Sequence, residues 1–327
     1  MGISEPIVSV VIPTLNRPHL VVRAVRSVLA QTLDEIEVIV VVDGPDEATV
    51  QALGQIDDDR VRAKPLPLHV GLGEARNAGV GEARSRWVAF LDDDDEWFPR
   101  KLEVQLQTAQ QSVYRHPIVS CRLIVRSEIG DVVWPMRCPR PDETMSEYLF
   151  CRTKVFSGEG MIGANTIFAT KELLLTVPFR GELQRHEDLD WLLRASTLDG
   201  VGVQFVPTRE PLVIWHREEA HNSMSRKTDW RYSLAWINNN KHLVTPKAYA
   251  SFLLTWLSAN AVREGDWKAF LLLLRDAFHS GRPSSLDVGL YFGIWLIPQR
   301  IRSRIRISFQ RRDDSAVCLD FRSRGSD

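Results

Sequence analysis

The chain has 327 residues, of which 44% are hydrophobic and 25% charged, a composition typical of a globular protein with one large domain or two modest ones. Its formal net charge of -1 gives no reason to expect a nucleic-acid partner. No apolar run reaches the ~18–20 residues of a membrane span, and the first residues lack the basic region and cleavage site of a signal peptide. The expected location is therefore the cytoplasm, with at most peripheral contact at the inner face of the membrane.

Short β-branched strands alternate with helical patterns in the first third of the chain. Strands are expected at residues 8–12, 37–42, 61–63 and 87–91, and helices at residues 20–29, 46–56, 73–84 and 99–111. This alternation predicts an α/β fold with a mostly parallel central sheet flanked by helices. Ligands of such sheets bind beyond the carboxyl ends of the strands, so the segments that follow the strands should gather at one edge.

The pattern changes from residue 118 onward. Paired strands are expected at residues 118–125 and 132–136, further strands at 162–169, 201–206 and 211–215, and a helix at 186–196. After residue 227 the chain is expected to be mainly helical. We therefore predict a catalytic domain over residues 1–225, with a nucleotide-sugar half at about 1–115 and an acceptor half at about 116–225. A helical C-terminal extension over 226–327 follows it.

Four consecutive aspartates, residues 92–95, follow the strand expected at 87–91. Clustered carboxylates repel one another unless a counter-charge lies among them. A divalent cation supplies that charge, and hard oxygen ligands suit Mg²⁺ or Mn²⁺. The Asp92-x-Asp94 spacing can serve a nucleotide and a metal together. The structural alternative is an exposed acidic turn that caps the helix beginning near Pro99.

Four segments occur in order along the first hundred residues: VSVVIPTLNR, VVVDG, VGLGEARNAGV and WVAFLDDDDEWFPRKLE. This ordered set resembles family 2 of the inverting glycosyltransferases, and the resemblance covers roughly residues 6–220. It implies the GT-A fold, a nucleotide-sugar donor with a UDP-sugar as the first candidate, and Mn²⁺ or Mg²⁺ as cofactor.

The resemblance also implies roles for individual residues. The donor-binding residues would be Pro13, Thr14, Asn16, Asp43, Arg76, Asn77, Asp92 and Asp93. Within this set Asp43 would contact the base. Asp94, which is not in this set, would bind the metal. The register within the aspartate run stays open, because four acidic residues follow one another. Arg76 and Asn77 also remain open to an interpretation as ordinary helix-surface residues.

The second half of the catalytic domain offers a base. Inversion requires the acceptor hydroxyl to lose its proton as it attacks, and a carboxylate is the expected base. By resemblance this base is Asp188, with Glu187 holding it in place. The alternative is that acidic residues merely favour a helix N-terminus. His216, after the strand at 211–215, is a candidate metal or diphosphate ligand or a structural histidine, and His221 is its weaker competitor.

The C-terminal region suggests where the acceptor lies. Apolar residues recur every three or four positions from Leu290 to Phe309, and six arginines lie between residues 300 and 312. A basic amphipathic helix, kinked at Pro298, can lie on an anionic membrane or pack on the catalytic domain. The first option predicts a glycan or lipid-linked acceptor in the assembly of a cell-surface polysaccharide or lipopolysaccharide.

Two other functions compete with this prediction. A nucleotidyltransferase of similar fold would carry a glycine-rich basic loop after the first strand, which residues 13–17 do not supply. A non-catalytic protein that binds sugar nucleotides would not require acidic residues at positions 94 and 188.

Overall fold

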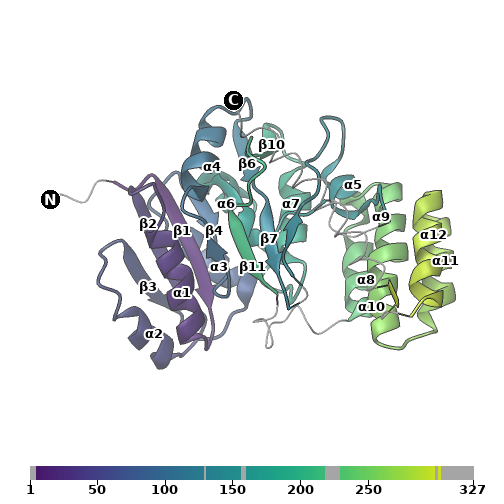
Figure 1. Ribbon diagram of the computed structural model, residues 1–327, viewed down its shortest axis with the longest axis horizontal. Helices are drawn as coiled ribbons and strands as arrows, with labels where there is room; N and C mark the ends of the chain where they lie inside the picture. Colours follow the sequence, from purple (N-terminus) through teal and green to yellow (C-terminus); the bar gives the residue numbers. More distant parts are fainter. Residues whose placement is uncertain (1–4, 129, 156–159, 218–228, 299–300, 303–327) are drawn as a thin grey trace, which may run out of the picture. The chain divides into compact units, whose positions relative to one another are not determined.

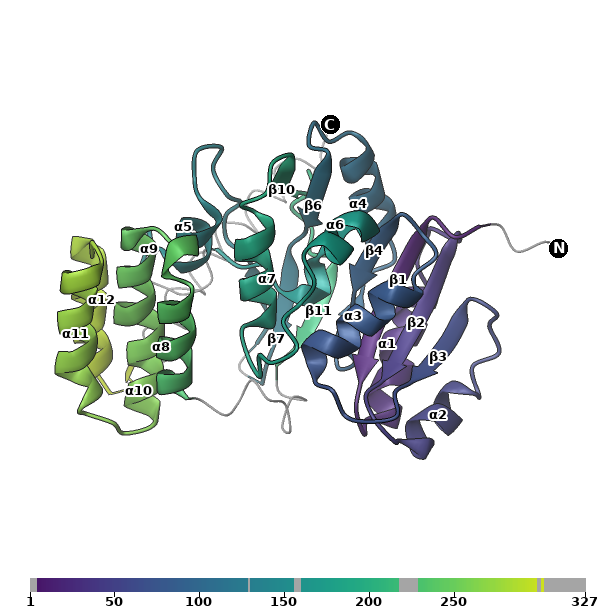
Figure 2. The ribbon, with the colours of Figure 1, turned by 180° about the vertical axis from the view of Figure 1, so that it is seen from behind.

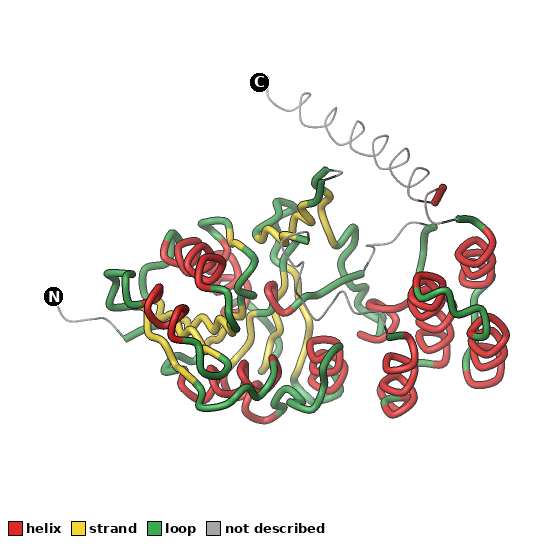
Figure 3. The backbone as a smooth tube through the Cα atoms, turned by 90° about the horizontal axis from the view of Figure 1, so that it is seen from below, coloured by secondary structure: helices red, strands yellow, loops and turns green. Residues whose placement is uncertain are grey.

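The computed structural model describes residues 5–128, 130–155, 160–217, 229–298 and 301–302 (Figure 1). The chain divides into two compact units. Unit 1 comprises Met1–Leu149 and Gly160–Lys227, and unit 2 comprises Phe150–Glu159 and Thr228–Asp327. Among the described residues both sheets belong to unit 1, whereas the regular elements of 229–298 are all helical (Figure 3).

A seven-stranded sheet in the order β10-β6-β9-β4-β1-β2-β3 forms the centre of unit 1. Its strands are β1 (Val8–Thr14), β2 (Ile36–Val42), β3 (Val61–Pro65), β4 (Trp87–Phe90), β6 (His116–Ser120), β9 (Phe168–Thr170) and β10 (Val201–Phe205). All neighbours pair in parallel except β9, which is antiparallel to β4 and β6. Every residue of β1 and β2 is buried, as expected of β-branched strands covered on both faces. The predicted mostly parallel sheet is confirmed.

Helices cover both faces of this sheet. They are α1 (Pro18–Leu29), α2 (Glu47–Leu53), α3 (Leu72–Glu82), α4 (Lys101–Gln110), α6 (Lys171–Thr176) and α7 (Glu187–Ala195). Helix α1 lies on the side seen in Figure 1, and α3 and α6 lie on the side seen in Figure 2. A Cβ atom at Gly79 would stand 2.3 Å from Cγ1 of Val11, so only glycine lets α3 lie this close to β1.

A second sheet of four strands has the order β5-β11-β7-β8. Its strands are β5 (Glu96–Trp97), β7 (Leu123–Arg126), β8 (Val132–Trp134) and β11 (Val213–His216). The single strand predicted at residues 118–125 is wrong, because the chain leaves the first sheet after β6 and enters the second at β7. Residues 162–169 are likewise only partly extended, since a 3₁₀ turn at Ala164–Thr166 precedes β9.

Unit 2 is built from α8 (Trp230–Asn239), α9 (Pro246–Ser251), a π-helical turn (Phe252–Leu257), α10 (Ser258–Arg263), α11 (Ala269–Ser280) and α12 (Ser285–Leu296). Phe150, far away in sequence, contacts the rings of Trp236, Phe252 and Trp256. The hydroxyl of Ser251 also donates a hydrogen bond of 2.8 Å to the carbonyl of Phe150. The segment that begins at Phe150 therefore belongs to the helical core of unit 2.

The end of α12 corrects one prediction. The helix stops at Leu296 instead of kinking at Pro298, because proline restricts the residue before it and provides no N–H donor. The rest of the predicted basic helix, from residue 303, lies outside the described residues. No helix in the described part of the chain is long and apolar enough to cross a membrane.

Candidate active site

Three segments that follow strands meet at the carboxyl edge of the large sheet, as predicted. The hydroxyl of Thr14 donates a 2.8 Å hydrogen bond to Oδ2 of Asp93. The backbone N–H of Asp43 donates to the carbonyl of Thr14 at 2.9 Å. Pro13 is buried in β1, whereas Asn16 is exposed in the left-handed region with φ of 54°. The ends of β1, β2 and β4 are thus joined directly.

The carboxylate of Asp43 holds the loop in front of α3. It accepts hydrogen bonds from the backbone N–H groups of Val70 at 2.7 Å and Gly71 at 3.0 Å. The Nδ1 atom of His69 lies 2.8 Å from the same carboxylate. Gly71 has a φ of 91°, which favours glycine, and it directly precedes α3. Asp43 therefore fixes where α3 begins.

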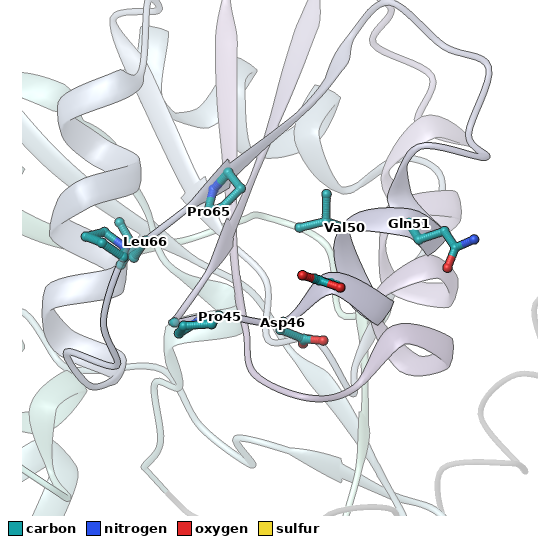
Figure 4. Close-up of a pocket in the computed structure, with 9 residues that line it drawn as sticks. Pro45, Asp46, Val50, Gln51, Pro65 and Leu66 are labelled. Atoms are coloured by element: carbon teal, nitrogen blue, oxygen red, sulfur yellow. The ribbon is translucent and has the colours of Figure 1, made fainter.

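A pocket lies between the chain that follows β2 and the end of β3 (Figure 4). It is lined by Gly44, Pro45, Asp46, Glu47, Val50, Gln51, Pro65, Leu66 and Pro67. Asp46 is held in place, because it accepts hydrogen bonds from the backbone N–H groups of Asn16 and Thr49. The exposed lining of the pocket is almost wholly apolar, contributed by proline and aliphatic side chains.

Arg17 neutralises part of the aspartate run, a role that the sequence analysis did not assign to it. Its Nη1 donates to Oδ1 of Asp93 at 2.9 Å and to Oδ2 of Asp94 at 3.2 Å. Burial raises the pKa of Asp94 to about 6, and the charges of Asp92 and Asp93 add to this effect while Arg17 opposes it. The negative charge of the run is therefore only partly compensated by the protein.

Asp95 has a structural place in the second sheet. Its carboxylate accepts hydrogen bonds from the side-chain amide of Asn165 and from the backbone N–H of His216. Burial raises the pKa of Asp95 well above its usual range. The Nε2 atom of His216 lies 2.7 Å from Oε1 of Glu96, in strand β5. Glu96 is a further residue that sequence reasoning missed, since only the β5–β11 pairing brings it to His216.

Arg76 connects the aspartate run to α7. Its Nη2 donates to Oδ1 of Asp92 at 2.8 Å, and its Nη1 donates to Oε1 of Glu187 at 3.0 Å. Burial acts to lower the pKa of Arg76, but the charges of Asp92, Glu187 and Asp188 outweigh it and raise the pKa. Only 1% of the side chain is exposed, so the interpretation as an ordinary surface charge is wrong.

Asp188 lies in the first turn of α7, beside Glu187. Its Oδ1 accepts a 2.7 Å hydrogen bond from the backbone N–H of Leu189. Burial raises the pKa of Asp188 to about 7, and the Glu187 charge adds to this while Arg76 opposes it. His186, which directly precedes α7, has a left-handed φ of 66°. A carboxylate whose pKa lies near neutrality is suited to accept a proton.

Asn77, one position after Arg76, bonds to the backbone in front of α7. Its Nδ2 donates to the carbonyl of Phe179 at 2.8 Å, and its Oδ1 accepts from the N–H of Phe179 at 2.9 Å. Arg76 also lies over the Phe179 ring, 5.5 Å from its centroid. Helix α3 thus positions the segment that leads to the candidate base.

The carboxylates of the aspartate run fit a divalent cation by their chemistry. In the described part of the chain, no three acidic, histidine or cysteine side chains lie together as ready-made metal ligands. Mg²⁺ is commonly bound through one or two carboxylates while substrate phosphates complete the shell. Asp94, buried and incompletely neutralised, offers such a carboxylate. His221 lies outside the described residues.

Comparisons with known proteins agree on one family. Residues 9–162 match the model of "Glycosyl transferase family 2". The chain is 29% identical over 253 residues to the amylovoran biosynthesis glycosyltransferase AmsB of Erwinia amylovora, covering 74% of this chain and 80% of AmsB.

Two further matches have a nucleotide in their names. The chain is 33% identical over 100 residues to the UDP-Glc:alpha-D-GlcNAc-diphosphoundecaprenol beta-1,3-glucosyltransferase WfgD of Escherichia coli, covering 31% of this chain and 40% of WfgD. The crystal structure of S. aureus TarS 1-349 in complex with UDP has a TM-score of 0.53 at 18% identity, covering 88% of this chain and 89% of TarS 1-349. This last likeness supports the GT-A fold.

Proposed function

This chain belongs to family 2 of the glycosyltransferases, and we propose that it moves a sugar from a nucleoside-diphosphate donor to an acceptor hydroxyl with inversion of the anomeric carbon. The observation that carries the proposal is the Arg76 bridge. One buried guanidinium holds a carboxylate of the aspartate run and the Glu187 carboxylate beside Asp188. The donor side and the base side of one reaction centre are thereby held together.

We propose that the nucleotide binds at the carboxyl edge formed by β1, β2 and β4. Pro13, Thr14 and Asn16 would line its pocket, and Asp43 would contact the base. The hydrogen bonds from the 69–71 loop to Asp43 support this proposal, because they fix one side of the base site before the donor binds. The names of WfgD and of the TarS complex favour a UDP-sugar as donor.

We propose that Asp188 takes the proton of the acceptor hydroxyl while the oxygen attacks the anomeric carbon. The bond from the sugar to the nucleoside diphosphate breaks as the new glycosidic bond forms, so no covalent enzyme intermediate is needed. Glu187 and Arg76 hold Asp188 in position. Asn77 acts on the same segment through its two hydrogen bonds to Phe179, and we propose a positioning role for it.

Asp94 would hold Mn²⁺ or Mg²⁺, and His216 is a second candidate ligand. When bound, the ion would balance the charge of the donor diphosphate. Asp92 and Asp93 would approach the ribose or the sugar of the donor. The Glu96 carboxylate at Nε2 supports a ligand role for His216, because metal-binding histidines usually have a carboxylate at the other ring nitrogen.

We propose a glycan or lipid-linked acceptor in the assembly of a cell-surface polysaccharide or lipopolysaccharide. The functions in the names of AmsB and WfgD support this class of acceptor. A location in the cytoplasm, in peripheral contact with the inner face of the membrane, would bring the enzyme to such an acceptor. The basic residues between 300 and 312 are one candidate for that contact, and this stays a prediction.

The test is turnover of a nucleotide-sugar panel by purified protein with Mn²⁺ or Mg²⁺, read as released nucleoside diphosphate. We expect metal-dependent release from one donor. Asp188→Asn should lower it by roughly 10²–10⁴-fold, since the base is removed while the shape is kept. Asp94→Asn should abolish the response to metal. Asp34→Asn is the matched control, because its carboxylate is 90% exposed and it precedes β2, at the opposite end of that strand from Asp43.

The outcomes separate the competing functions. Equal release by wild type and both site variants would overturn the site assignment. Metal-dependent binding of nucleotide without turnover of any donor, even with lipid-linked acceptors present, would favour the non-catalytic alternative. The anomeric configuration of the product, read by NMR, tests inversion separately.

A further inference from the structure

Large apolar side chains are exposed where the start of α11 meets the end of α12. Trp267, Leu271, Phe292 and Leu296 are 64%, 71%, 40% and 70% exposed. We call these four residues the α11–α12 apolar surface. Trp267 lies just before α11, Leu271 lies in α11, and Phe292 and Leu296 lie in α12. The two helices are antiparallel neighbours in unit 2 (Figures 1 and 2).

Ring contacts join the two helices at this point. The Trp267 ring lies 5.3 Å from that of Trp295, which directly precedes Leu296. The Phe270 ring, directly before Leu271, lies 6.2 Å from the Phe292 ring. These contacts bring the exposed side chains into one neighbourhood. A clustered apolar surface on a folded protein marks a binding site more often than scattered single residues do.

Basic side chains border this surface. Lys268 follows Trp267 directly, and Arg275 lies one turn beyond Leu271. Both are exposed. Their side chains can meet an anionic partner at the same time as the apolar residues enter it.

The acidic side chains of the same stretch are engaged inside unit 2. Asp276 accepts a 2.6 Å hydrogen bond from the hydroxyl of Tyr249. Asp287 accepts from the hydroxyl groups of Ser251 and Ser284, and it is buried. Asp266 accepts from Trp230 Nε1, and Glu264 accepts from the Trp230 backbone N–H. Asp266 also pairs with Arg231, so the acid next to Trp267 is neutralised, while Lys268 and Arg275 are exposed to solvent.

We propose that the α11–α12 apolar surface docks on a lipid bilayer that carries anionic headgroups. Tryptophan and leucine side chains enter the boundary between headgroups and acyl chains, and lysine and arginine bind the anionic headgroups around them. A second copy of the chain fits this surface less well, because two such surfaces facing each other would bring their basic residues together. This site differs from the basic segment between residues 300 and 312.

The experiment is flotation of the full-length chain with vesicles of phosphatidylcholine alone or with one third phosphatidylglycerol. We expect the wild type to float with the anionic vesicles. The triple variant Trp267→Ser, Leu271→Ser, Leu296→Ser should lower the partition coefficient by at least about tenfold, because three apolar side chains no longer leave water. Lys268→Gln with Arg275→Gln should lower it severalfold and weaken its dependence on salt.

The matched control is Val113→Ser with Leu175→Ser, which removes apolar side chains that are 90% and 56% exposed in unit 1. This control should float like the wild type. Circular dichroism and thermal unfolding check that each variant is folded.

Equal flotation of wild type and triple variant would overturn the proposal and assign the contact to another segment. A dimer in sedimentation that the triple variant dissociates, without flotation, would overturn it in favour of a second copy. Neither result depends on sugar transfer.

Discussion

Two arginines neutralise the carboxylates of the site, and the protein holds them in different ways. Arg76 has 1% of its side chain exposed and bridges Asp92 and Glu187 from within α3. Arg17 has 23% exposed and reaches Asp93 and Asp94 from the rim. The buried arginine is part of the framework, because removing it leaves partly buried charges without a partner. Arg17 contacts the Asp94 carboxylate, which is the proposed metal ligand, so Arg17 and a metal ion would compete for that carboxylate.

The largest expected effect follows from Arg76→Met. We expect the free energy of unfolding to fall by about 3 kcal/mol at pH 7, because Asp92 and Glu187 lose their shared cation. Nucleotide release should fall with it. Urea unfolding measures the first effect. Arg60→Met is the control, since Arg60 forms a partly exposed pair with Asp58 and should change stability by less than about 1 kcal/mol. Equal losses in both variants would refute the framework role.

The second effect is a pH dependence. Burial and Glu187 raise the pKa of Asp188 to about 7, so below pH 7 the carboxyl is mostly protonated and cannot accept a proton. The turnover rate at saturating Mn²⁺ should therefore rise with pH, approaching tenfold per unit well below 7, and level off above it. Residual turnover of Asp188→Asn should lack this rise. A wild-type profile that is flat from pH 5.5 to 8 would exclude Asp188 as the base.

Arg17→Gln should have a moderate effect, and it should strengthen a property of the site, the affinity for Mn²⁺, instead of weakening one. Without the competing guanidinium, we expect the protein free of nucleotide to bind Mn²⁺ about three- to tenfold more tightly, a modest change because Arg17 is partly exposed. Electron paramagnetic resonance of free Mn²⁺ measures the affinity. Arg60→Gln serves as control. An unchanged affinity would mean that Arg17 and the ion do not share Asp94.

Glu96→Gln should have the smallest effect. The amide keeps a hydrogen-bonding group near Nε2 of His216 but removes the charge, so Mn²⁺ affinity should fall by about two- to threefold. The same Mn²⁺ titration detects this change. If His216→Ala binds Mn²⁺ like the wild type, the histidine is structural and the Glu96 prediction has no basis.

The sequence was sufficient for the parts of the molecule that local pattern determines. The β-branched runs at 8–12 and 37–42 became fully buried parallel strands, and residues 13–17, 43–44 and 92–95 came together at one edge. Helix α7 begins at Glu187, as its acidic first turn indicated. The break between β6 and β7 could not be predicted, because neither glycine nor proline marks it and only the pairing partners differ.

The contacts of the site that could not be predicted from the sequence are all tertiary contacts. Arg17 follows a predicted loop, and its spacing from Asp93 and Asp94 carries no local signal. Glu96 reads as one more acid after four aspartates until β5 pairs with β11 and brings it to His216. The partner of Asn77 has no local signal either, because Phe179, which bonds to both ends of its amide, lies about a hundred residues further along the chain.

The position of Phe150 has a consequence for synthesis on the ribosome. Residues 150–155 belong to unit 2 but emerge before residues 160–227 of unit 1. The rings that surround Phe150 come from Trp236, Phe252 and Trp256, which are translated roughly 100 residues later. At ~5–20 residues per second, this aromatic side chain waits roughly 5–20 s for its partners. Unit 2 therefore cannot complete its core until nearly the whole chain has left the exit tunnel. In a nascent chain stalled before α8, Phe150 has none of these rings around it and is accessible to chaperones.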